Sequence, residues 1–291
     1  MYRRVVTLGP LAGCTRVTPT SGNVRGHVVL VPGMHHDAWY FGGLQVHLAT
    51  RGYESVALTL KPFSLLRTST AMDGGRLKDI QAALRELDFP KKPVLLGHSQ
   101  GGLLVQMFMD NESRNEQPQC RGIVLYATGA LGQLSPFMDL VSQVTGALGM
   151  VNMMTVAAHG YNTDADEMKK LFFLPTTTST NVTGETITLE EYWRLTSTSN
   201  VSCIGEGTTT YTHPLYSRWI LHNPRPFRVP SLVVFAEQDV LYRAIHRDWL
   251  VKYHGSSLLV ATNQAHCLGD PGWEDSVANP LADWLDDLYL H

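Results

Sequence analysis

Six short runs of apolar residues stand along the chain, and none of them alternates regularly with polar residues. Unbroken Val, Ile and Leu are typical of strands that are buried on both faces of a parallel sheet. We therefore predict buried strands at residues 27–31, 55–60, 93–97, 122–127, 231–236 and 257–261. At the N-terminus, residues 4–8 and 15–18 flank a Gly-Pro pair, which predicts a leading β-hairpin.

Helical patterns lie between these runs, at residues 77–87, 101–109 and 280–290. Strands that alternate with helices are typical of an α/β fold, in which helices flank both faces of a mostly parallel central sheet. We therefore predict this fold class for the chain.

Residues 129–228 interrupt the alternation, because about 100 residues pass without a convincing buried strand. The first part of this segment, 137–158, is rich in Met, Val and Leu and predicts a helix, and 189–195 predicts another. A structureless loop of this length is uncommon inside a compact domain. We expect residues 129–228 to form a mainly helical cap, inserted into a core that consists of residues 1–128 and 229–291.

Composition narrows the functional classes. Hydrophobic residues make up 44% of the 291 residues and charged residues 17%, so the chain has ample material for a core. The net charge of −3 leaves no basic surplus for nucleic acid, and no apolar run reaches the roughly 18 residues of a membrane span. The four cysteines are widely spaced and give neither a zinc signature nor a dense disulfide framework.

The first fourteen residues allow two interpretations. Two arginines, a short apolar stretch and small residues before Cys14 are similar to a lipoprotein-type export signal. However, two glycines and a proline interrupt the apolar stretch, which is already at the lower limit of length. We favour the β-hairpin and therefore expect a cytoplasmic protein.

One stretch carries a chemical pattern. GHSQGG at 97–102 satisfies G-x-S-x-G, directly after a predicted buried strand and directly before a predicted helix. This context is typical of a nucleophile elbow, because small residues beside the serine let strand and helix pass closely. Ser99 is therefore the predicted nucleophile, and the alternative is a tight turn with an incidental serine. Side chains beside an elbow serine point away from it, so His98 is expected to pack.

A serine hydroxyl needs a base, and the base needs an acid that orients it. Asp239 follows the strand at 231–236 and His266 follows the strand at 257–261, in the chain order Ser, acid, His. Both therefore lie at carboxyl ends of strands, as Ser99 does. Glu237 is the rival acid, but it lies closer to the strand and is expected to pack or pair at the sheet edge.

Acyl transfer also needs N–H donors for the oxyanion. We expect them to be the backbone N–H groups of Gln100, which follows the nucleophile, and of Met34, in the loop after the first buried strand. Candidate pocket residues lie in the same loop and in the cap: His35, His36, Phe137, Met138 and Met154. We predict no metal site, because His35, His36 and Asp37 are adjacent and three adjacent residues rarely converge on one ion.

These motifs resemble the α/β-hydrolase fold superfamily over almost the whole chain, through VLVPG at 29–33, GHSQGG at 97–102, FAEQD at 235–239 and NQAH at 263–266. The loop at 32–39 is similar to that of the plant methylesterase and hydroxynitrile lyase branch, although Pro32 and Asp37 replace its usual His and Gly. Lyases of that branch have a Thr and a Lys where this chain has Gly33 and Cys267. The resemblance therefore implies ester hydrolysis rather than that lyase chemistry.

Three functions remain open. The first is a serine hydrolase that cleaves an ester or lactone of a largely hydrophobic small molecule through an acyl-enzyme, without a cofactor. The second is another enzyme on the same triad, such as a C–C hydrolase, lyase, eliminase or cyclase, in which His266 is the base and Ser99 only positions the substrate. The third is a hydrolase-fold ligand receptor, since a fold does not determine chemistry. Substrate identity and oligomeric state are not indicated by the sequence.

Overall fold

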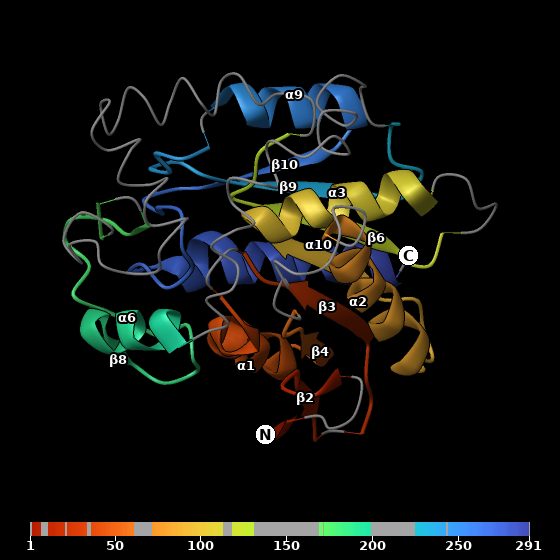
Figure 1. The fold of residues 1–291 in the computed structure, drawn as a ribbon, viewed down its shortest axis with the longest axis horizontal. Helices are drawn as coiled ribbons and strands as arrows, with labels where there is room; N and C mark the ends of the chain where they lie inside the picture. Colours follow the sequence, from red (N-terminus) through yellow and green to blue (C-terminus); the bar gives the residue numbers. More distant parts are fainter. Residues whose placement is uncertain are drawn as a thin grey trace.

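The structure, a computed structural model, describes residues 2–6, 11–20, 22–33, 36–60, 72–112, 118–130, 169–170, 172–198, 225–242 and 244–290. Its centre is an eight-stranded sheet with the strand order β1-β2-β4-β3-β5-β6-β9-β10 (Figure 1). The last six strands in this order are parallel to one another, and β1 and β2 run antiparallel at one end. The predicted mostly parallel α/β sheet is therefore confirmed.

The parallel strands coincide closely with the apolar runs: β3 (Gly26–Val31), β4 (Tyr53–Ala57), β5 (Val94–His98), β6 (Gly122–Tyr126), β9 (Ser231–Ala236) and β10 (Ser257–Ala261). The prediction of a strand at 55–60 is wrong at both ends, because β4 begins earlier and already ends at Ala57. The leading hairpin is confirmed, with β1 (Tyr2–Val6) antiparallel to β2 (Thr15–Pro19).

Helices cover both faces of the sheet. One buried cluster joins the strands to α1 (Gly42–Thr50), α10 (Asn279–Leu290), the short helix η2 (Ala38–Phe41) and the π-helix η5 (Glu274–Ala278). The other joins them to α2 (Met72–Glu86), α3 (Gln100–Glu112) and α9 (Ala244–His254). The predicted helices at 101–109 and 280–290 lie within α3 and α10, and the one at 77–87 lies within α2 except for its last residue. In contrast, α1 and α9 had no clear pattern in the sequence.

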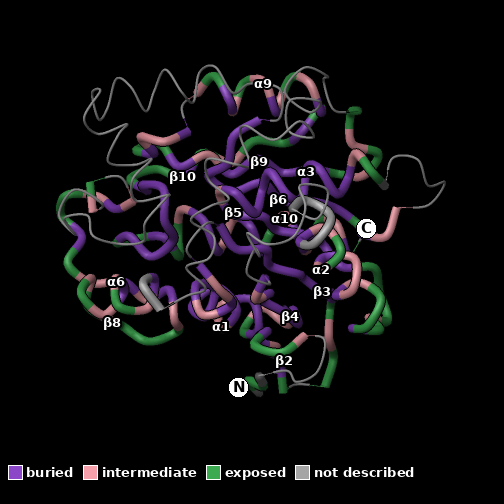
Figure 2. Tube along the Cα trace, in the orientation of Figure 1, coloured by how far each residue is buried: buried purple, intermediate pink, exposed green. Residues whose placement is uncertain are grey.

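Strand β10 differs from the expectation of burial on both faces. It is the last strand of the sheet, and its Leu258 and Val260 side chains are 43% and 39% exposed. The central strands β3 and β5 are buried throughout, as the tube coloured by burial shows (Figure 2). An apolar run predicts a strand, but its place at an edge or in the centre depends on which strands pair with it.

The segment between β6 and β9 contains residues 129–228, which the sequence predicts to form the cap. Its described residues include β7 (Ser179–Thr180), β8 (Ile187–Thr188) and α6 (Leu189–Thr198), and α6 contains the predicted helix at 189–195. The predicted helix at 137–158 lies outside the described residues. Residues 172–198 pack directly on the core near α1, since the Gly43 N–H donates to the Val182 carbonyl at 2.8 Å. Phe173, Val182 and Tyr192 share one buried cluster with α1 and α10.

Candidate active site

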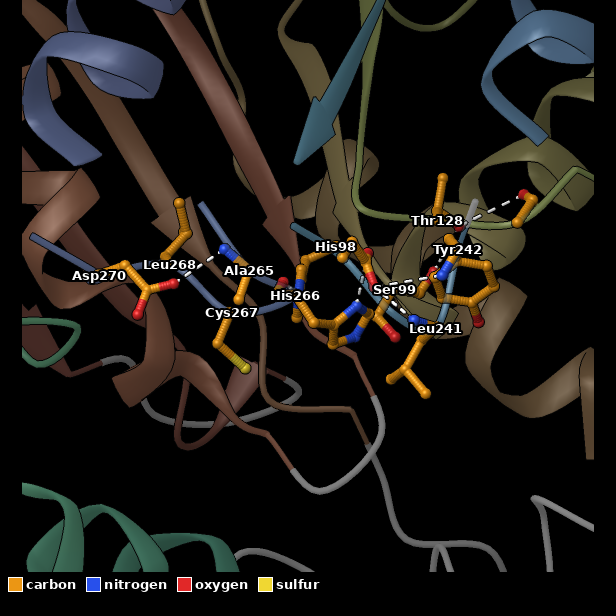
Figure 3. A network of polar contacts seen from close by, with 12 residues as sticks. His98, Ser99, Thr128, Leu241, Tyr242, Ala265, His266, Cys267, Leu268 and Asp270 are labelled. Carbon is orange, nitrogen blue, oxygen red and sulfur yellow. Dashed lines mark hydrogen bonds and ion pairs between the residues drawn. The ribbon is translucent and has the colours of Figure 1, made fainter. Parts of the chain in front are cut away.

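Ser99 stands at a sharp turn between β5 and α3. Its φ of +53° lies in the left-handed region, where a residue with a side chain is strained. Three contacts hold it there: the Ser99 N–H donates to the Tyr126 carbonyl at 3.0 Å, and its carbonyl accepts from the Gly102 N–H at 3.0 Å and the Thr128 hydroxyl at 2.6 Å (Figure 3). This is the strained strand–turn–helix geometry expected of a nucleophile elbow.

Two glycines allow the close packing around this turn. A Cβ atom on Gly101 would collide with the carbonyl oxygens of Val31 and Pro32, so only glycine lets α3 pass the end of β3. A Cβ atom on Gly33 would lie 2.9 Å from the Ser99 Cβ. The loop predicted to supply an oxyanion donor therefore begins directly beside the predicted nucleophile.

His266 and Asp239 form a buried pair. The Nδ1 atom of His266 lies 3.0 Å from Oδ2 of Asp239, and their side chains are 1% and 0% exposed. The other carboxylate oxygen accepts the N–H groups of Leu241 at 2.7 Å and Tyr242 at 3.1 Å. Because the carboxylate only accepts, the proton of a neutral His266 is on Nδ1, which leaves Nε2 able to take a proton.

The rival acid, Glu237, does not take part in this pair. Its Oε2 atom accepts the Asn263 N–H at 3.3 Å, and this hydrogen bond is exposed to solvent. Glu237 therefore bridges the two loops that follow β9 and β10, in agreement with the expectation that it pairs at the edge.

His98 links the nucleophile strand to the His266 loop. The residue is fully buried, as expected, but its Nε2 atom also donates to the His266 carbonyl at 2.9 Å (Figure 3). The ring centroids of His98 and His266 are 5.0 Å apart, and the Tyr40 ring stacks on His98 with a centroid distance of 4.7 Å. Burial lowers the pKa of His98 well below its usual value, and the neighbouring His266 and His36 lower it further. His98 is therefore a neutral donor, a role that the sequence did not reveal.

The remaining predicted residues are only partly described. Gln100 begins α3, and its side-chain oxygen accepts from the buried guanidinium of Arg76 at 3.0 Å. His36 is buried, and its Nε2 atom lies 2.5 Å from the Tyr192 hydroxyl of the inserted segment. The other candidates lie outside the described residues: Met34, His35, Phe137, Met138 and Met154.

Two aromatic rings that the sequence did not single out flank His266. Phe172, from the inserted segment, and Tyr242, from the loop after β9, have ring centroids 5.5 Å and 5.6 Å from that of His266. The imidazole therefore has two aromatic rings beside it, in addition to the Asp239 carboxylate and the His98 ring. Within the described ranges, no three His, Cys, Asp or Glu side chains group as metal ligands would.

Comparison with known proteins identifies the family. Residues 28–278 match the profile of the Alpha/beta hydrolase family, and the chain belongs to that family. No curated protein matches the chain. Membership of this family supports a hydrolase activity for the chain. The same chain contains the elbow and the buried His–Asp pair.

Solved structures with the same fold include an esterase from Exiguobacterium antarcticum, at 12% identity and a TM-score of 0.61, with 100% of each chain covered. A thermophilic esterase from Thermogutta terrifontis matches at 15% identity and a TM-score of 0.61, with 99% of each chain covered. A proline iminopeptidase from Mycobacterium smegmatis matches at 13% identity and a TM-score of 0.62, covering 100% of this chain and 99% of its own. At these identities the likeness concerns the fold alone. Among the helices described here, none has the length and apolar character needed to cross a membrane.

Proposed function

We propose that this chain is a serine hydrolase that cleaves an ester or lactone of a largely hydrophobic small molecule through an acyl-enzyme. The observation that carries the proposal is the strained backbone of Ser99 between β5 and α3. Ser99 follows the carboxyl end of its strand, as do Asp239 and His266, which form a buried pair. Strain at such a residue persists only where the surrounding contacts hold it, and it clusters at catalytic sites.

The mechanism begins with a neutral His266 that carries its proton on Nδ1. His266 takes the Ser99 proton on Nε2, and Asp239 stabilises the resulting imidazolium through Nδ1. The Ser99 oxygen attacks the carbonyl carbon, and the backbone N–H groups of Gln100 and Met34 hold the negative oxygen of the tetrahedral intermediate. His266 then protonates the leaving alcohol. A water molecule deprotonated by His266 attacks the acyl-enzyme, and Ser99 leaves with the proton that His266 returns.

The setting of His266 supports an apolar substrate. The rings of Phe172 and Tyr242 lie beside the imidazole. An apolar acyl group that packs against these rings is removed from water without the loss of hydrogen bonds, which favours its binding. No cofactor takes part in any of these steps.

Two measurements on one variant test the proposal. Ser99→Ala should lower kcat/KM for short p-nitrophenyl esters by at least about 10³-fold, because the nucleophile acts as a unit with its base. A fluorophosphonate should label the wild-type protein at Ser99 and fail to label the variant. Ser276→Ala is the matched control, since the Ser276 hydroxyl donates to the Gly272 carbonyl within the segment around η5.

The outcomes separate the open functions. Full activity of Ser99→Ala, or labelling at another residue, would refute the assignment of the nucleophile. Loss of activity without any acyl-enzyme by mass spectrometry would instead favour general-base chemistry by His266. Rapid cleavage of p-nitroanilides but not of esters would retain acyl transfer and overturn the ester substrate.

A further inference from the structure

The backbone of the segment that carries His266 is tied to three distant parts of the chain and to Asp270, which follows in the same loop. The Ala265 N–H donates to Asp270 Oδ2 at 2.9 Å, and the His266 carbonyl accepts from His98. The next two residues continue the series, since the Cys267 N–H donates to the Phe172 carbonyl at 2.9 Å and the Leu268 N–H to the Tyr40 hydroxyl at 2.8 Å. Each residue from 265 to 268 thus has one backbone group fixed from outside.

Asp270 connects the loop that carries His266 to the inserted segment. Its side chain is completely buried, and while Oδ2 accepts from Ala265, Oδ1 accepts the Leu174 N–H at 3.1 Å and the Thr177 hydroxyl at 2.5 Å. Figure 3 shows Asp270 and Ala265 in the network that continues to His266, His98 and Ser99. Three donors converge on two oxygens, which only an ionised carboxylate can satisfy in full. The proposed mechanism makes no use of this group.

A buried carboxylate is costly unless its hydrogen bonds are satisfied, and burial raises the pKa of Asp270 accordingly. An apolar residue would fill the same space without that cost. The three hydrogen bonds to the Asp270 carboxylate offset this cost. They also join the described part of the insertion to the loop after β10, close to His266.

We propose that Asp270 is a positioning residue for His266, and that it makes the base depend on the docking of residues 172–178 against the His266 loop. The proposal rests on the proposed function, because it assumes that His266 is the base. Without the Asp270 oxygens, the Ala265 N–H loses its partner and the backbone that positions the imidazole is less firmly held. The inserted segment is then a support for the catalytic base as well as a cover.

Asp270→Asn tests this role with little change of shape. An amide offers one acceptor oxygen, so at least one of the Leu174 and Ala265 N–H groups loses its partner. We expect kcat for a short p-nitrophenyl ester to fall about 10-fold to 100-fold, as for a misplaced base, with KM changed by less than about twofold. The rate of fluorophosphonate labelling at Ser99 should fall by the same factor. Hydrogen exchange should be faster at the amides of 265–268 and unchanged in β3 and β5.

Thr177→Val is the second variant, and it covers the case in which Asp270→Asn does not fold. It removes one donor from the insertion and leaves the Asp270–Ala265 bond intact, so we expect a smaller loss of kcat in the same direction. Asp286→Asn is the control, because Asp286 accepts from Arg25, Arg51 and Tyr53, and Tyr53 is the first residue of β4, at the end of the strand away from the carboxyl ends that carry the site. It should lower the melting temperature without altering kcat.

The results distinguish the two proposals. If the wild-type protein is not labelled at Ser99, both the proposed function and the role of Asp270 fail. If it is labelled, and folded Asp270→Asn or Thr177→Val retains the wild-type kcat and labelling rate, only the role of Asp270 fails. Equal losses of kcat in Asp286→Asn and Asp270→Asn would show a general effect of stability and would also overturn it.

Discussion

At the scale of single residues, hydrogen bonds to neighbouring groups hold the polar groups of the candidate site in place. Asp239 accepts two N–H groups besides His266, and the Thr128 hydroxyl donates to the Ser99 carbonyl. Such contacts fix both the position of a side chain and which of its atoms donate or accept. A substitution that preserves shape but exchanges an acceptor for a donor should therefore be severe.

Asp239→Asn is the sharpest substitution of this kind. The amide oxygen can still accept from Leu241 and Tyr242, but its NH₂ group then faces Nδ1 of His266 and favours the tautomer with the proton on Nε2. We expect kcat to fall by about 10⁴-fold with the fold intact, measured with p-nitrophenyl esters.

The rival carboxylate provides the comparison. Glu237→Gln alters the side-chain contact with the Asn263 N–H, away from His266, and should leave kcat within about twofold of the wild type. A large loss in Glu237→Gln together with a small loss in Asp239→Asn would reverse the choice of acid.

At the scale of elements, similar apolar runs form strands that contribute unequally to the free energy of unfolding. Strand β5 lies between β3 and β6 with every residue buried, whereas β10 pairs only with β9 and exposes two of its apolar side chains. The difference arises from strand order, which is a property of long-range pairing. Packing losses should therefore depend on the position in the sheet rather than on the residue type.

A pair of identical substitutions tests this. Leu96→Ala in β5 removes a side chain that is 2% exposed and should lower the free energy of unfolding by about 2–5 kcal/mol. Leu258→Ala in β10 should lower it by less than about 1 kcal/mol, because that side chain is already 43% in solvent. Urea unfolding gives both values, and equal losses would contradict the edge position of β10.

At the scale of the whole molecule, buried histidines couple stability to pH. Burial lowers the pKa of His254 to about 4 and that of His246 to about 4, the latter against the opposing charge of Asp239. His98 is shifted in the same direction. In the unfolded chain these groups take up protons near pH 6.5, whereas in the folded protein they remain neutral to much lower pH.

The sign of the pH dependence follows. A lowered pKa in the folded state contributes stability that is present above about pH 6.5 and is lost as the pH falls toward 4. We expect the free energy of unfolding to decrease steadily from pH 7 to pH 4.5, measured by urea titration at each pH.

One variant isolates a single histidine. The His254 ring stacks on Phe227 at 3.6 Å, and neither ring nitrogen has a hydrogen-bond partner among the described residues. His254→Phe should therefore reduce the loss of stability between pH 7 and pH 4.5 and keep the stacking. An unchanged slope in this variant would contradict the role of His254.

The sequence by itself determined what depends on neighbours along the chain. The strands follow from apolar runs, and the elbow follows from GHSQGG between a strand and a helix, because periodicity and steric strain are local properties. The choice of Ser99, Asp239 and His266 also followed from their positions after predicted strands, in that order along the chain, and their roles stay predictions. Only the tertiary structure revealed the edge position of β10, the donation from His98 to His266 and the buried tie through Asp270. The first depends on which strands pair in the sheet. The other two depend on hydrogen bonds between residues that are separated by 168, 93 and 96 positions along the chain, for which no local pattern exists.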